Sequence, residues 1–88
     1  MNNNLEGIWR IWDVMAFMNI ARSTVYLRVK QQLLTPPVKY GPRVAGWPQH
    51  EIKEIVYAYN SGQNEAEIEA LVRQLIEDRQ KIIKPLNE

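Results

Sequence analysis

Cysteine is missing from this chain of 88 residues, and that absence excludes disulfide bonds and cysteine-ligated metal sites. No apolar run approaches the roughly 20 residues that a membrane span requires. The first residues also lack the basic and apolar regions of a secretory signal. We therefore expect a small cytoplasmic protein of one domain, without a cofactor, a bound metal or a membrane partner.

Acidic residues are missing from a long interval in the middle of the chain. No Asp or Glu occurs between Asp13 and Glu51, although the formal net charge of the whole chain is only +1. A locally basic segment in a nearly neutral protein indicates an anionic partner at that place, the alternative being a chance cluster on a solvated face. Five bases lie in the interval: Arg22, Arg28, Lys30, Lys39 and Arg43.

Hydrophobic periodicity divides the rest of the sequence into helices and short strands. Asn19 tolerates the left-handed conformation that ends a helix, and Pro36 with Pro37 disfavours continuation of the next one. The expected helices cover residues 12–18, 23–34, 48–60 and 65–84, and the expected strands cover 8–11, 38–40 and 44–47.

The second expected helix has two faces of different character. At helical spacing, its apolar residues predict an inward face of Val25, Tyr26, Val29 and Leu33. The outward face then comprises Ser23, Thr24, Leu27, Arg28, Lys30 and Gln31.

A stiff basic hairpin follows this helix, in the stretch TPPVKYGPRVAGW. We expect Gly41 to adopt a positive φ and Pro42 to fix its own φ, so that the turn is rigid. Lys39 and Arg43 place two bases on the hairpin. Trp47 ends its second strand and is expected in the core.

The element order is strand, helix, turn, helix, hairpin, helix, which is the layout of a winged helix-turn-helix. A helix about 10–12 Å across fits the DNA major groove, which is about 12 Å wide. The expected fold class is mainly α with a small antiparallel sheet. We assign residues 1–5 to a disordered N-terminus, 6–60 to the winged helix-turn-helix domain and 61–88 to a C-terminal amphipathic helix.

The segment NIARSTVYLRVKQQLLTPPVKYGPRVAGWPQHEI resembles the AlpA-type phage and prophage regulators, which are grouped with excisionases among MerR-like winged-helix proteins. The resemblance covers about residues 8–58. It implies double-stranded DNA binding with transcriptional regulation, or excisionase-like control of the direction of site-specific recombination. An integrase is the protein partner that the recombination role would involve.

The resemblance also implies which residues contact DNA. Two positions differ from the family: Ala21 stands where a serine is usual, and Leu27 stands where a base is common. Leu27 is expected to contact a thymine methyl group instead. The implied major-groove residues are Arg22, Ser23, Leu27 and Lys30 with Thr24 and Arg28 beside them, and the implied wing contacts are Lys39, Gly41 and Arg43.

The C-terminal segment carries an apolar stripe that needs a partner surface. It either docks on the domain or forms a homodimer through Ile68, Leu71, Val72, Leu75 and Ile76, and a protein-interaction adaptor that works through this helix is the alternative function. No enzyme is expected, because the spacing of Ser23, His50 and Asp13 gives no support for a hydrolase.

Overall fold

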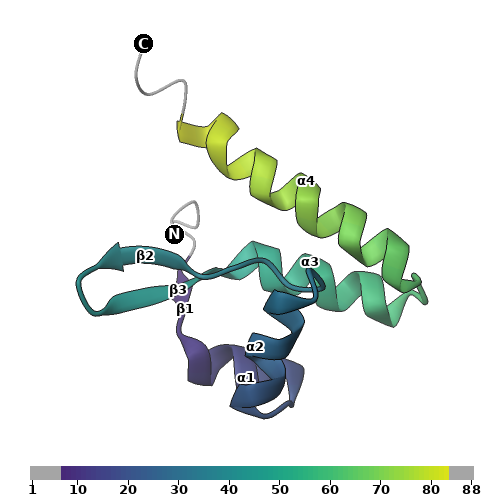
Figure 1. The fold of residues 1–88 in the computed structure, drawn as a ribbon, viewed down its shortest axis with the longest axis horizontal. Coiled ribbons are helices and arrows are strands. Elements are labelled where there is room, and N and C mark those ends of the chain that lie inside the picture. The colour runs from purple at the N-terminus through teal and green to yellow at the C-terminus, as the bar shows by residue number, and fades with distance from the viewer. Residues whose placement is uncertain (1–6, 84–88) are drawn as a thin grey trace.

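The computed structural model describes residues 7–83, which form four helices and a three-stranded antiparallel sheet (Figure 1). The predicted fold class is therefore confirmed. The disorder expected for residues 1–5 concerns positions outside the described residues. The elements are β1 (Ile8–Trp9), α1 (Ile11–Met18), α2 (Arg22–Lys30), β2 (Val38–Gly41), β3 (Val44–Pro48), α3 (Gln49–Asn60) and α4 (Glu65–Ile83).

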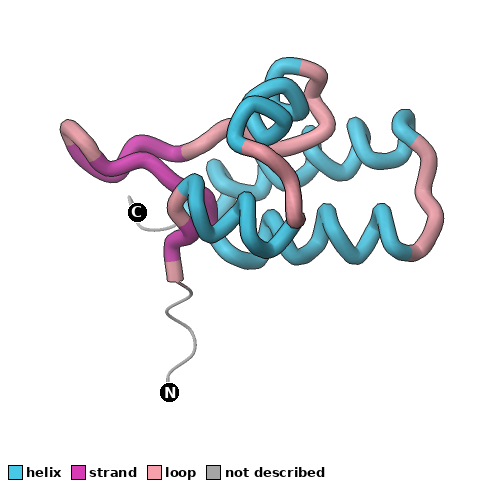
Figure 2. The backbone as a smooth tube through the Cα atoms, turned by 90° about the horizontal axis from the view of Figure 1, so that it is seen from below, coloured by secondary structure: helices cyan, strands magenta, loops and turns pink. Residues whose placement is uncertain are grey.

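The sheet has the order β1-β3-β2, so β3 is its central strand. β1 pairs with the end of β3, where Trp9 lies opposite Trp47. The β2–β3 hairpin projects away from the helices at one end of the molecule (Figure 2). The first strand is shorter than predicted, because α1 already begins at Ile11.

Helix α1 begins and ends where local chemistry favours it. The backbone N–H of Arg10 donates to Asp13 Oδ2 at 2.9 Å, so the carboxylate satisfies a donor at the helix start. Asn19 has φ 58° and ψ 50°, which confirms that it ends the helix in the left-handed conformation.

Helix α2 ends at Lys30, several residues earlier than predicted. Gln32 adopts a left-handed φ of 66°, and the N–H of Leu33 donates to the carbonyl of Arg28 at 2.9 Å. This is a Schellman ending with glutamine in the position that glycine usually takes. It turns the chain sharply, so Leu33 and Leu34 are buried outside the helix.

Trp47 is in the core, as predicted, with 1% of its surface exposed. Its indole Nε1–H donates to the carbonyl oxygen of Thr35 at 2.7 Å, which satisfies the polar atom of a buried ring. Trp9 packs against the same core, whereas Trp12 is 57% exposed. The buried hydrophobic residues are Val14, Val25, Leu33, Leu34, Trp47, Ile52, Ile55, Ala58, Ile68, Val72 and Leu75.

Helix α4 docks along α3 within the same chain (Figures 1 and 2). Ile68, Val72 and Leu75 belong to the shared core, and Leu71 and Ile76 pack against it. Of the two arrangements left open by the sequence, the structure therefore has docking. A homodimer through the same stripe would need Ile68, Val72 and Leu75, which are already buried within one chain.

An ion pair holds the far end of α4 to α3. The guanidinium of Arg79 donates from Nε to Glu51 Oε2 at 2.7 Å and from Nη2 to Glu51 Oε1 at 2.6 Å. The Glu51 side chain is fully buried, and Arg79 is 21% exposed. In the sequence Arg79 interrupts the apolar stripe, but in the fold its guanidinium is the hydrogen-bond partner of the buried Glu51 carboxylate.

Gly46 lies where β1 runs very close to β3, and this close approach gives the first prediction. A Cβ added at Gly46 would lie 2.6 Å from the carbonyl oxygen of Trp9 and 2.7 Å from Ile8 Cγ2. Gly46→Ala should therefore lower the free energy of unfolding by about 1–3 kcal/mol, measured by urea denaturation. Gly41→Ala is the matched control, since its Cβ would find nothing closer than 3.9 Å. Equal stability of the two variants would contradict the close approach of β1 to β3.

Arg79 provides the second prediction. Arg79→Ala leaves Glu51 buried without its ionic partner, so we expect a loss of about 3–5 kcal/mol in the free energy of unfolding. Lys81→Ala removes the same charge from an exposed pair with Asp78, 3.8 Å apart, and should change stability by less than about 1 kcal/mol. Thermal and urea melts of both variants measure the difference. Similar melts would show that the Arg79–Glu51 pair does not hold α4 in solution.

Candidate nucleic-acid interface

The solvent-facing side of α2 is a continuous strip of side chains. Arg22, Tyr26 and Lys30 are four residues apart and therefore lie above one another on the helix. Ser23 and Leu27 form a second row beside them. All are exposed, so we define the outer face of α2 as Arg22, Ser23, Tyr26, Leu27 and Lys30.

Tyr26 belongs to this face, although the apolar spacing of the sequence predicts that it points inward with Val25. That prediction is wrong, because Tyr26 is 47% exposed while Val25 is fully buried. Successive helical residues are about 100° apart, so the neighbour of a buried residue need not be buried. Tyr26 is four residues from both Arg22 and Lys30, and this spacing is the sequence signal that places it on the outer face.

Thr24 and Arg28 lie at the margin of the outer face and are half-buried. The Arg28 guanidinium carbon is 5.4 Å from the centre of the Tyr59 ring on α3, which is a cation–π contact. Burial raises the pKa of the Tyr59 hydroxyl above its usual 10.0, although the charge of Arg28 acts in the opposite direction. Arg28, which the sequence places on the outward face, therefore lies at the edge of that face, with its side chain turned toward α3.

The hairpin of β2 and β3 forms the wing. Gly41 pairs with Val44, which leaves Pro42 and Arg43 as the two turn residues. Pro42 fixes its own φ at the second position of the turn. Gly62 is the only glycine with a positive φ in residues 7–83, so the positive φ predicted for Gly41 is wrong.

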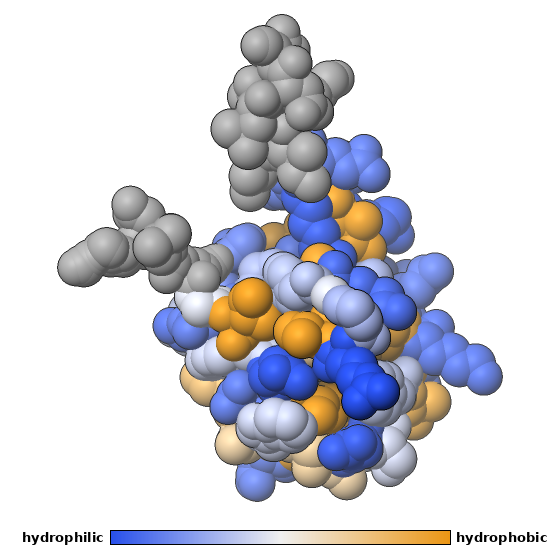
Figure 3. All heavy atoms as spheres, turned by 90° about the vertical axis from the view of Figure 1, so that its left-hand side faces the viewer, coloured by the Kyte–Doolittle hydropathy of each residue, from blue (hydrophilic) through white to orange (hydrophobic). Residues whose placement is uncertain are grey.

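The bases of the wing are exposed. Lys39 and Arg43 both reach solvent, whereas Gly41 is half-buried. Figure 3 looks at the end of the molecule from which the hairpin projects, and hydrophilic side chains lie there among hydrophobic ones. Together with Arg22 and Lys30 on α2, the wing carries a positive charge that no acid from the interval between Asp13 and Glu51 offsets.

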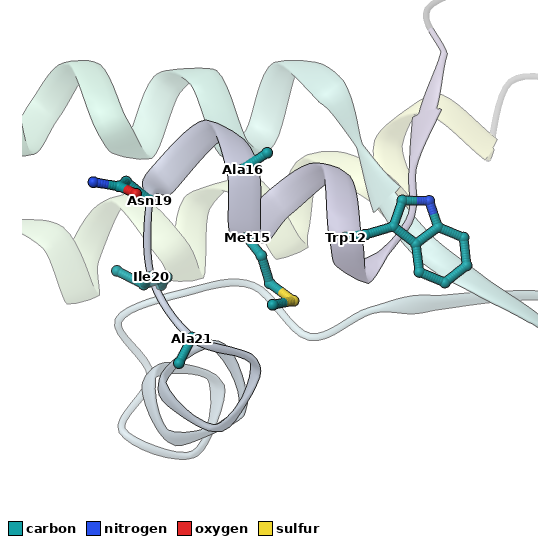
Figure 4. Close-up of a pocket in the computed structure, with 6 residues that line it drawn as sticks. All are labelled: Trp12, Met15, Ala16, Asn19, Ile20 and Ala21. Atoms are coloured by element: carbon teal, nitrogen blue, oxygen red, sulfur yellow. The ribbon is translucent and has the colours of Figure 1, made fainter.

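A shallow groove of about 490 Å³ runs along α1 to the start of α2. Figure 4 shows Trp12 at one end of the groove and Asn19 and Ile20 at the other. No acid, base or histidine lines the groove, so it has no group for acid–base catalysis. Ala21 is the N-cap of α2 and makes no capping hydrogen bond through its side chain.

We also searched residues 7–83 for a metal site and for a membrane-spanning helix. That region contains no group of three or more His, Asp or Glu side chains arranged to hold a metal ion. None of its helices is both long and apolar enough to cross a membrane. His50 is half-buried at the start of α3.

The comparisons with known proteins bear on the segment that forms β1 to α3. Neither the search of curated proteins nor the search of solved structures found a match. Residues 7–57, however, match the family described as prophage CP4-57 regulatory protein (AlpA). The match includes the outer face of α2, the wing and Trp47, and it ends before α4. Because it spans more than half of the chain, this protein belongs to the AlpA family of prophage regulatory proteins.

Proposed function

We propose that this protein binds double-stranded DNA sequence-specifically and acts as a regulator of a phage or prophage. The outer face of α2 would enter the major groove, and the wing would contact the neighbouring backbone or minor groove. The observation that carries the proposal is the exposure of two bases on α2 and two on the wing, within a segment that has no acid. Membership of the AlpA family supports it.

The outer face of α2 has suitable chemistry for reading bases. Arg22 and Lys30 can donate to guanine, and Ser23 can exchange hydrogen bonds with several base edges. Leu27 is 50% exposed and offers an apolar contact for a thymine methyl group. Tyr26 lies between the two bases and contributes both a ring and a hydroxyl group.

The wing would supply affinity more than base discrimination. Lys39 and Arg43 suit phosphate oxygens or the negative potential of a narrow minor groove. Gly41 has no side chain, so DNA can approach the backbone of the wing closely. Thr24 and Arg28, at the margin of the outer face, would contact the backbone beside the groove.

The biological role would be excisionase-like control of recombination direction, transcriptional regulation, or both. In the recombination role an integrase would be the protein partner. The two roles are compatible, because a protein that occupies DNA at an attachment site also blocks a promoter located there. Footprinting on the DNA that flanks its own gene tests the proposal, and protection of one defined site is the expected result. No structural observation favours the adaptor alternative, since the apolar stripe of α4 packs on the domain.

The wing gives the third prediction. Arg43→Ala should weaken binding to specific and scrambled duplexes by the same factor and should reduce the slope of log K against log salt by about one unit. Arg73→Ala is the control, because it removes the same charge from an exposed position on α4. Fluorescence anisotropy over a salt series measures both slopes. A change in sequence preference caused by Arg43→Ala would contradict the assignment of the wing to the DNA backbone.

Tyr26 gives the fourth prediction. Tyr26→Ala should weaken binding to the footprinted site by about 1–3 kcal/mol and leave binding to scrambled DNA nearly unchanged. Tyr57→Ala is the control, because Tyr57 is 61% exposed but lies on α3, outside the proposed interface. Competition binding with both duplexes measures the effect. If the two variants behave alike, the outer face of α2 does not read the DNA.

A further inference from the structure

Arg79 makes a third contact besides its two hydrogen bonds with Glu51. Its Nη2 also donates to the backbone carbonyl of Pro36 at 2.8 Å. Pro36 lies in the segment between α2 and β2, at the root of the wing. One guanidinium thus joins α4, the start of α3 and the chain that leads into the wing.

The carbonyl before Pro36 is held as well. Thr35 accepts the indole N–H of Trp47 at 2.7 Å, and Thr35 and Leu34 are almost completely buried. Two consecutive carbonyls at the root of the wing are therefore fixed by side chains from other elements. Trp47 holds one from β3, and Arg79 holds the other from α4.

We propose that Arg79 is a positioning residue for DNA binding: by holding Pro36 and Glu51 together, it sets the orientation of the wing relative to α2. The inference rests on the proposed function. If α2 and the wing contact the same duplex, the distance between them must be fixed. A mobile wing would lose conformational entropy on binding, and this loss would weaken affinity. Arginine suits this place because its planar fork serves several acceptors at once, whereas lysine has one nitrogen.

A purely stabilising role is the competing explanation, and it predicts different behaviour. Replacing a buried ion pair by apolar residues of similar volume often leaves the stability of a protein unchanged or raises it. The double variant Glu51→Met/Arg79→Leu should therefore fold while it loses the hydrogen bond to Pro36. Arg79→Lys is the second variant, because it keeps a positive charge beside Glu51 without the fork.

The first measurement needs no DNA. Nuclear magnetic resonance on the full chain follows the hydrogen exchange of the Trp47 indole N–H and the backbone dynamics of the wing amides. In Glu51→Met/Arg79→Leu we expect about tenfold faster indole exchange and increased motion of Lys39–Val44, while the amides in the middle of α3 keep their protection. Unchanged exchange and unchanged wing motion in both variants would overturn the inference.

The second measurement is a double-mutant cycle on the footprinted duplex. Once the wing is loose, the loss of affinity caused by Arg43→Ala should shrink several-fold in the Glu51→Met/Arg79→Leu background, because Arg43 then contributes less. The loss caused by Arg22→Ala on α2 should stay the same in both backgrounds. Additivity of Arg43→Ala with the variant would overturn the inference and leave the proposed function intact. Failure of the unmodified protein to bind any duplex would instead refute the proposed function, while the exchange measurement still decides whether Arg79 orders the wing.

Discussion

The hydrogen bond from the Trp47 indole to the Thr35 carbonyl, inside a closed core, is the contact on which the arrangement of the domain depends. Trp47 is the last apolar residue of the central strand, and it faces Trp9 of β1 across the sheet. Its ring therefore lies where β1, the root of the wing and the start of α3 come together. This pairing of β1 with β3 requires glycine at position 46, because a Cβ there would collide with β1.

Local chemistry made much of the fold predictable from the sequence. Asn19 and Pro42 act through backbone geometry, which the residue type alone indicates. The features that the sequence did not reveal depend on distant or indirect contacts. Arg79 looked like an interruption of the stripe because its partner Glu51 is 28 residues away in the chain. The left-handed Gln32 was missed because glutamine seldom takes that conformation.

The candidate site was predictable in its elements but less so in its orientation. The basic hairpin and the second helix could be identified from composition and spacing, and the structure exposes Arg22, Lys30 and both wing bases. The rotation of α2 about its axis was harder to predict, because Tyr26 and Arg28 are both amphipathic. Each can bury part of its side chain and expose the rest. Packing against Tyr59 decides the orientation of Arg28, and no pattern within α2 contains that information.

The charge distribution gives α4 a further physical consequence. In Figure 1, α4 lies on the opposite side of α3 from α1 and α2. Its five acids, Glu65, Glu67, Glu69, Glu77 and Asp78, outnumber its three bases, Arg73, Arg79 and Lys81, whereas every charged residue of α2 and the wing is a base. The net charge is merely +1, so attraction of the whole protein to DNA is weak beyond a Debye length of about 10 Å. The separation of charge, rather than its sum, would therefore orient the wing and α2 toward the duplex and turn the acidic helix away from it.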